Sequence, residues 1–82
     1  MDNILHFNKP KKLGSSKLGK VKWWNDARRM GFVIADGEEF LITDKNPEIL
    51  PHLKEGVDIR FVPYETVRGL EARDLELPQI TI

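Results

Sequence analysis

Residues 18–43 read LGKVKWWNDARRMGFVIADGEEFLIT, and this stretch carries the strongest indication of the fold. Apolar and polar side chains alternate within it over short segments, which is the pattern of β-strands with one buried face. Asp36-Gly37 stands between two apolar runs and favours a tight hairpin, because both central residues of a type I′ turn need a positive φ. We therefore predict three consecutive strands over residues 18–25, 30–35 and 38–43.

Two further strands are expected after this stretch. Ile59 and Phe61 have the spacing of residues on one face of a strand. Pro63 should lie at an edge or a bulge, because proline cannot donate a ladder hydrogen bond. The long loop over 44–56 contains prolines and a glycine, together with two adjacent apolar residues that favour a helical turn. The two additional strands are predicted over residues 57–64 and 70–77.

Five short strands are too few for a sandwich of two sheets, which typically needs about seven. They suit a small closed barrel, which leaves no free sheet edge for aggregation. Barrels of this size are mainly OB-folds or SH3-like barrels, and strand lengths do not distinguish the two. We predict a basic flexible tail over residues 1–17, a barrel over 18–79 and a short C-terminal end over 80–82.

Composition excludes several classes of protein. The 82-residue chain has no cysteine, which excludes disulfides, thiolate metal sites and cysteine nucleophiles. Its longest apolar run is the four residues Phe32–Ala35, far short of the roughly 20 that span a membrane. The N-terminus has no apolar stretch typical of a secretory signal. We expect a cytoplasmic protein without a membrane partner.

The charges are unevenly distributed although the formal net charge is zero. Residues 1–31 carry eight cations and two anions, whereas residues 32–82 carry five cations and eleven anions. The basic first part could form one positive face. Alternatively, the two parts could lie against each other and neutralise. Counting charges does not decide between these arrangements.

The segment 20–32 combines cations with aromatic rings. Cations follow phosphates and rings stack on bases, so this combination is typical of single-stranded nucleic-acid binding. Val33 is a natural core residue, which places Met30 and Phe32 on the outer face by alternation. The cations are Lys20, Lys22, Arg28 and Arg29, and the rings are Trp23, Trp24 and Phe32.

Each of these features also has a purely structural interpretation. Trp23 and Trp24 are adjacent, so strict alternation places one of them in the core unless a bulge turns both outward. Phe32 could be covered by the N-terminal tail or by a second subunit. The lysines could be ordinary exposed strand residues that discourage edge pairing.

No pattern for catalysis is present. His6 and His52 each stand alone, without a partner at a useful spacing. Glu38 and Glu39 are neighbours on a predicted strand and face opposite ways, so they cannot form a carboxylate dyad. No glycine-rich phosphate loop follows a strand. We expect a protein that is not an enzyme and that holds no metal or cofactor.

Three segments resemble the cold-shock domain family. Gly19–Val33 is similar, without a gap, to the family's opening, Gly-Lys-Val-Lys-Trp-Phe-Asn followed after about three residues by Lys-Gly-Phe-Gly-Phe-Ile. Leu53–Phe61 resembles its Leu-Lys-Glu-Gly-x-x-Val-x-Phe segment, and Arg68–Ala72 its Lys-Gly-Pro-Gln-Ala. The resemblance covers residues 18–77 in the family's order and nearly its length.

This resemblance implies a five-stranded OB-type barrel that binds single-stranded RNA and DNA through aromatic residues on its first three strands. Carried over by position, it implies binding roles for Lys20, Lys22, Trp23, Trp24, Arg28, Phe32 and Arg68.

The chain departs from the family at five positions of the predicted surface. Arg29 replaces a glycine, Met30 and Leu41 replace aromatic residues, Thr43 replaces a histidine, and Asp44 replaces a further aromatic residue. A thioether stacks on a base less well than a ring does, and a carboxylate repels phosphate. Binding should therefore be weaker or narrower than in a typical member, although the Arg29 guanidinium could compensate by stacking or by pairing with phosphate.

We expect a nucleic-acid-binding module for single-stranded RNA or DNA, of the RNA-chaperone or regulatory type. The alternative is a barrel that uses its apolar face to bind a protein partner or to form a homodimer. The expected nucleic-acid-binding residues are Lys20, Lys22, Trp23, Trp24, Arg28, Arg29, Met30, Phe32, Leu41, Thr43 and Arg68.

Overall fold

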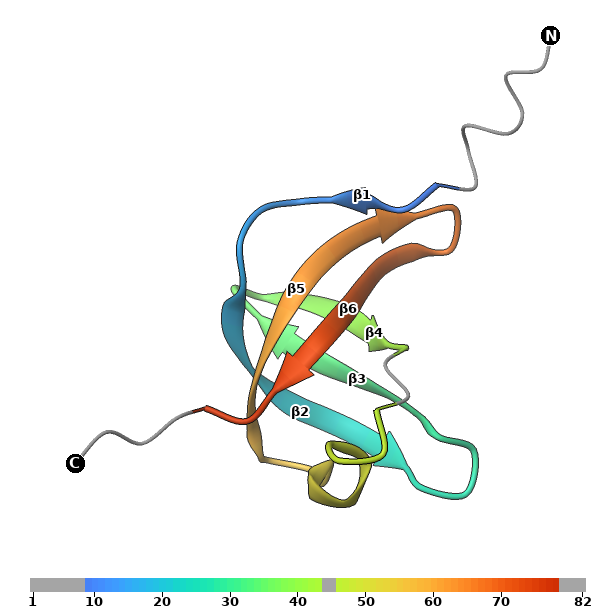
Figure 1. Ribbon diagram of the computed structural model, residues 1–82, viewed down its shortest axis with the longest axis vertical. Helices are drawn as coiled ribbons and strands as arrows, with labels where there is room; N and C mark the ends of the chain where they lie inside the picture. Colours follow the sequence, from blue (N-terminus) through green and yellow to red (C-terminus); the bar gives the residue numbers. More distant parts are fainter. Residues whose placement is uncertain (1–8, 44–45, 79–82) are drawn as a thin grey trace, which may run out of the picture.

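The computed structural model describes residues 9–43 and 46–78, and this part of the chain is a small all-β barrel (Figure 1). Within these ranges one 3₁₀ turn, η2 (Leu50–His52), lies in the loop that precedes β5 (Asp58–Thr66). No helix in these two ranges is long and apolar enough to cross a membrane. The strands are β1 (Lys11–Lys12), β2 (Lys17–Asn25), β3 (Met30–Ala35), β4 (Glu38–Ile42), β5 (Asp58–Thr66) and β6 (Gly69–Glu76), and η2 spans Leu50–His52.

Five strands close the barrel in the order β5, β2, β3, β4 and β6, with β6 pairing back onto β5. All of these pairs are antiparallel except β4 with β6, which run parallel through Leu41–Glu71 and Ile42–Ala72. In this arrangement the third and fifth barrel strands lie side by side, as they do in an OB-fold. The predicted all-β, five-stranded OB-type barrel is confirmed.

The hairpin predicted at Asp36-Gly37 is present. Asp36 has a φ of 54° and Gly37 a φ of 79°, the two positive values that a type I′ turn requires. Ala35 and Glu38 pair on either side of this two-residue loop. The turn fixes the register of β3 on β4 and therefore decides which side chains share a face.

The core lies inside the barrel and is closed at one end by the loop before β5. Ile59 and Phe61 are fully buried, as their spacing indicated. The helical turn expected in the loop is η2, beside which Ile49, Leu50 and Leu53 pack into the core. The other buried apolar residues are Val21, Val33, Ala35, Phe40, Ile42, Ala72 and Leu75.

Part of the segment predicted as a flexible tail is paired with the barrel. Lys11–Lys12 lies beside Tyr64 and Glu65, and the Leu13 amide donates to the Pro63 carbonyl at 2.9 Å. β2 pairs with β5 only as far as Phe61, so the second half of β5 would otherwise have an open edge. Residues 11–13 cover that edge. Residues 1–8 lie outside the described ranges.

Candidate nucleic-acid interface

A β-bulge in β2 decides which tryptophan faces outward. Val21 pairs with Val33 and Trp23 pairs with Phe32, so Lys22 is an extra residue with no partner of its own on β3. Without the bulge, strict alternation from buried Val21 through outward-facing Lys22 would turn Trp23 inward. With it, Lys22 and Trp23 both face outward and the next residue turns toward the core.

Three apolar side chains form a row across the outer face of the barrel. The Trp23–Phe32 and Phe32–Leu41 pairs join β2, β3 and β4 at the same level. The rings of Trp23 and Phe32 have centroids 6.3 Å apart and planes inclined by 34°. Met30 and Ile34 extend the row along β3 in both directions. We call Trp23, Met30, Phe32, Ile34 and Leu41 the outer patch.

The outer patch is open to solvent in the described part of the molecule. Trp23 is 43% exposed, Met30 42% and Ile34 36%, whereas Phe32 and Leu41 are half-buried. β1 pairs with β5 rather than with the strands that carry the patch. Burying such side chains in a complex would remove apolar area from water, at about 25 cal/mol per Å².

Trp24 is not part of this patch. Its ring is half-buried and packs against the core cluster, and its Nε1 has no hydrogen-bond partner among the described residues. Gly31 lies opposite it, and a Cβ there would stand 2.2 Å from the Trp23 carbonyl oxygen and 2.7 Å from the Trp24 ring. The absence of a side chain at Gly31 leaves the space that the Trp24 indole occupies.

Ion pairs neutralise the lysines of β2. Lys17 contacts Asp36 at 3.0 Å, Lys20 contacts Asp58 at 2.7 Å, and Lys22 pairs with a carboxylate of β4. Each pair joins the basic first part of the chain to the acidic second part, so these lysines follow the neutralising arrangement. Exposed pairs contribute only about 0–1 kcal/mol each, which phosphate groups can displace.

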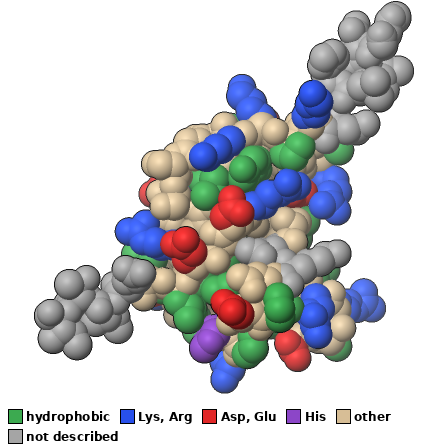
Figure 2. Space-filling view, viewed as in Figure 1, with side chains coloured by type: hydrophobic (Ala, Val, Ile, Leu, Met, Phe, Trp, Pro, Cys, Tyr) green, Lys and Arg blue, Asp and Glu red, His purple; other side chains and the backbone are tan. Residues whose placement is uncertain are grey.

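The opposite side of the barrel also carries both signs of charge. Figure 2 shows acidic and basic side chains interspersed over the side formed by β5 and β6, rather than one continuous basic surface. This agrees with the balanced composition of the whole chain, which has 13 cationic and 13 acidic side chains.

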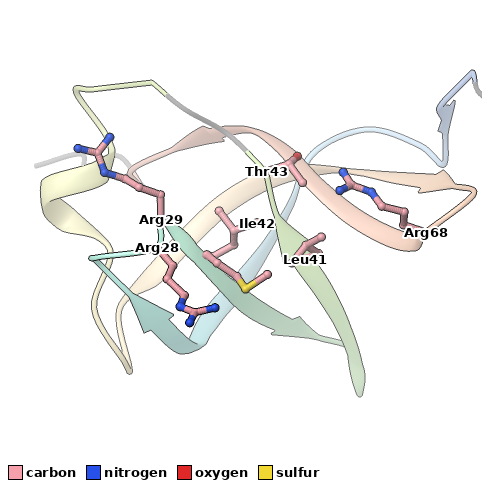
Figure 3. A pocket seen from close by; sticks show the side chains of 7 residues that line it. Arg28, Arg29, Leu41, Ile42, Thr43 and Arg68 are labelled. Atoms are coloured by element: carbon pink, nitrogen blue, oxygen red, sulfur yellow. The ribbon is translucent and has the colours of Figure 1, made fainter.

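Arginines gather at a hollow beside the outer patch (Figure 3). The hollow has a volume of about 290 Å³, and Arg28, Arg29 and Arg68 border it. Within residues 9–43 and 46–78, Arg28 and Arg29 form no ion pair. The remaining lining residues are Met30, Leu41, Ile42 and Thr43.

Glu71 holds Arg68, the third arginine at the hollow, in position. This glutamate is only 1% exposed, and its carboxylate accepts hydrogen bonds from Arg68 at 2.9 Å, from Arg73 at 2.8 Å and from Thr66 at 3.1 Å. Burial opposes its ionisation, but the hydrogen bonds from Arg73, Thr66 and Arg68, with the charge of Arg73, hold the pKa of Glu71 below its ordinary value.

Sequence reasoning did not identify Glu71 and Arg73. Glu71 lies between Leu70 and the core residue Ala72, so alternation alone assigns it to an exposed face. The sequence signal for a paired carboxylate at this position was the presence of two arginines nearby, Arg68 three residues before it and Arg73 two residues after it. Arg73 also lies over the Tyr64 ring, 5.2 Å from its centroid.

The structure thus brings most of the predicted site residues together. Lys22, Trp23, Met30, Phe32, Leu41 and Thr43 share the outer face of β2–β4 and its continuation, with Arg28, Arg29 and Arg68 at its rim. Lys20 lies on the same side of β2 but pairs toward β5. Trp24 is turned inward, and Asp44 lies outside the described residues.

Comparison with known proteins adds no relative: no protein-family model matches the chain, and no curated protein sequence matches it. Among the described residues, no group of three His, Cys, Asp or Glu side chains is arranged to hold a metal ion. The features that bear on function are therefore the barrel, the outer patch and the arginines.

Proposed function

We propose that this protein is a binding module for single-stranded nucleic acid, similar to cold-shock domains, that acts through binding energy and carries out no chemical reaction. The observation that carries the proposal is the Trp23–Phe32 ring pair, an exposed and a half-buried ring on the outer sheet face next to a hollow bordered by arginines. A small OB-type barrel is compatible with this function.

The free energy that such a site can supply is sufficient to bind single-stranded nucleic acid. Each base that stacks on an aromatic ring contributes about 1–3 kcal/mol, and every base offers a π-face. Two rings support two bases, and Arg28 and Arg29, which form no ion pair with a described residue, add phosphate contacts at the rim. Met30 and Leu41 provide apolar contact without ring stacking. We expect a short binding site and an affinity that falls as salt is added.

Substitution of Phe32 tests the proposal. Phe32→Ala removes one stacking ring and should weaken binding of a thymidine hexamer by about 1–3 kcal/mol, or roughly 5- to 150-fold. Binding is followed by quenching of tryptophan fluorescence at low salt. Ile34→Ala is the matched control, because Ile34 lies on the same face of β3 but has no ring.

The outcomes separate base stacking from a general apolar contact. A small effect of Ile34→Ala beside a large effect of Phe32→Ala indicates stacking. Equal losses would indicate an apolar contact surface without base recognition, and the absence of any binding at low salt would contradict the proposed function.

A second candidate function is a protein-binding or dimerising barrel, favoured by one observation. Lys20 and Lys22 are already paired with carboxylates, which leaves the five apolar side chains of the outer patch as the main feature of this face. Sedimentation of the chain with and without oligonucleotide tests it. A concentration-dependent dimer that dissociates when Phe32 is replaced, with no oligonucleotide bound, would support this candidate over the first.

A further inference from the structure

We propose that the hollow bordered by Arg28, Arg29 and Arg68, which we call the arginine hollow, binds the terminal phosphate of the nucleic-acid strand. The inference rests on the proposed function, because it takes the bases of the same strand to lie on the outer patch. The preferred ligand is then a strand that ends in a phosphomonoester.

The position of the hollow is the first argument. Met30 and Leu41 belong both to its lining and to the outer patch, so the two sites are continuous. The hollow also lies where β3 begins, directly after the turn that carries Arg28 and Arg29. A strand whose bases stack on Trp23 and Phe32 therefore reaches the arginine hollow at the edge of the stacking surface.

Side chains of neighbouring residues hold the backbone of Arg28 and both the backbone and the guanidinium of Arg68 in place. The Arg68 amide donates to Thr66 Oγ1 at 3.0 Å, and its guanidinium donates to the buried Glu71 carboxylate at 2.9 Å. On the other side, the Arg28 amide donates to Asn25 Oδ1 at 3.1 Å. Guanidinium groups offer five donors each, so Arg68 keeps donors for a ligand.

Figure 3 shows how the three side chains are arranged. Arg28 and Arg68 lie on either side of Leu41, and the side chain of Arg29 extends away from both toward the loop that carries η2. Arg28 and Arg68 are therefore the two side chains placed to hold an anion from two sides, with Arg29 adding positive charge at the rim.

The chemistry of the lining favours a phosphate group over a base. Among the described residues no aromatic side chain borders the hollow, so a base would meet only the arginines, aliphatic groups, a thioether and a threonine. Its volume of about 290 Å³ lies at the lower limit of pockets for small organic ligands, which is about 300 Å³. A compact anion suits this space.

The charge favours the end of a strand over its interior. A phosphomonoester carries about −1.5 to −2 charges and three acceptor oxygens, whereas an internal phosphodiester carries a single charge. Three arginines, of which only Arg68 is paired with a carboxylate of the described chain, match the more highly charged group. Arginine also binds phosphate through two parallel hydrogen bonds.

The test is a thermodynamic cycle with short thymidine oligomers. The same tetramer is prepared with two hydroxyl ends, with a 5′-phosphate and with a 3′-phosphate, and its affinity is measured by calorimetry. We expect a phosphate at one of the two ends to strengthen binding about tenfold. Arg28→Gln should abolish that gain, because it removes one side of the arginine hollow without touching the core.

Arg60→Gln is the matched control. It removes the same charge from an exposed arginine of β5, whose guanidinium contacts only Ser16 among the described residues. This variant should keep the full gain from the terminal phosphate. A loss of the gain in both variants would indicate a general charge effect and would overturn the assignment.

Other outcomes of the same measurements separate the terminal-phosphate site from the proposed function and from binding of a free anion. If the three oligomers bind equally well and Arg28→Gln weakens all of them equally, the terminal-phosphate site is wrong while nucleic-acid binding stands. If none of them binds, the proposed function fails. If thymidine monophosphate or inorganic phosphate binds as tightly as the phosphorylated tetramer, the hollow serves a free anion and the strand-end assignment is overturned.

Discussion

Arg29 holds a backbone conformation that costs an arginine free energy. Its φ is 55°, in the left-handed region where the Cβ of an L-residue meets the backbone. The resemblance to cold-shock domains places a glycine at this position, which adopts that conformation freely. Arg29 borders the arginine hollow and also a second hollow of about 280 Å³, which it lines together with Asp26, Pro47, Leu50 and Pro51. Strain of this kind is often retained at functional sites.

We predict that Arg29→Gly leaves the stability unchanged or raises it by up to about 1 kcal/mol, while it weakens nucleic-acid binding. Urea denaturation measures the first effect and fluorescence titration the second. Arg28→Gly is the control: Arg28 does not have a positive φ, so glycine there should only destabilise. A clear loss of stability in Arg29→Gly would contradict the strain argument.

At the scale of the strands, the ion pair of Lys22 crosses the outer face of β2–β4. Lys22 lies on β2 and Glu39 on β4, with the whole of β3 between them, so their backbones are about 10 Å apart. The register places the pair between Phe32 and Ile34, over the outer surface of β3. A nucleic-acid strand on the outer patch must displace this contact or pass beside it.

Removing the carboxylate of this pair should therefore improve binding. Glu39→Gln frees Lys22 for phosphate and removes a negative charge from the face, and we predict an affinity for the thymidine hexamer about two- to fivefold higher at low salt. Glu38→Gln makes the same charge change at the neighbouring exposed position, which forms no ion pair with a described residue. An equal gain in both variants would show that only net charge matters.

At the scale of the whole molecule, the buried glutamate links stability to pH. The pKa of Glu71 is lowered in the folded state from its ordinary value of 4.5, so folding favours the ionised form. The stabilisation is therefore fully present above about that ordinary value. It is lost as the pH falls through the lowered pKa of the folded protein.

We predict that Glu71→Gln lowers the free energy of unfolding at neutral pH by about 1–3 kcal/mol, because charge-assisted hydrogen bonds to both arginines are weakened. The stability of this variant should also fall less at acidic pH than the stability of the unchanged protein does. Urea midpoints measured across that pH range check both effects. Glu76→Gln, at an exposed position of the same strand, should keep the acid-side decline.

Local patterns were sufficient to predict the five strands of the barrel and the helical turn before β5, but they did not predict β1. The β3 strand was predicted with its observed ends, and the Asp36-Gly37 turn with the correct signs of φ. Both depend on interactions between neighbours in the chain, since alternation and turn chemistry are local properties. The barrel followed from the number and length of the strands.

Neighbouring residues along the chain were therefore enough to specify the five barrel strands, the turn between β3 and β4, and the residue types available for binding. The outward position of Trp23 rather than Trp24 depends on tertiary pairing, because a bulge exists only in relation to a partner strand. Closure of the barrel paired the lysines of β2 with carboxylates as distant as Asp58 and brought Arg28 and Arg68 to the same hollow. These features depend on register and closure, which bring together residues that no local pattern connects.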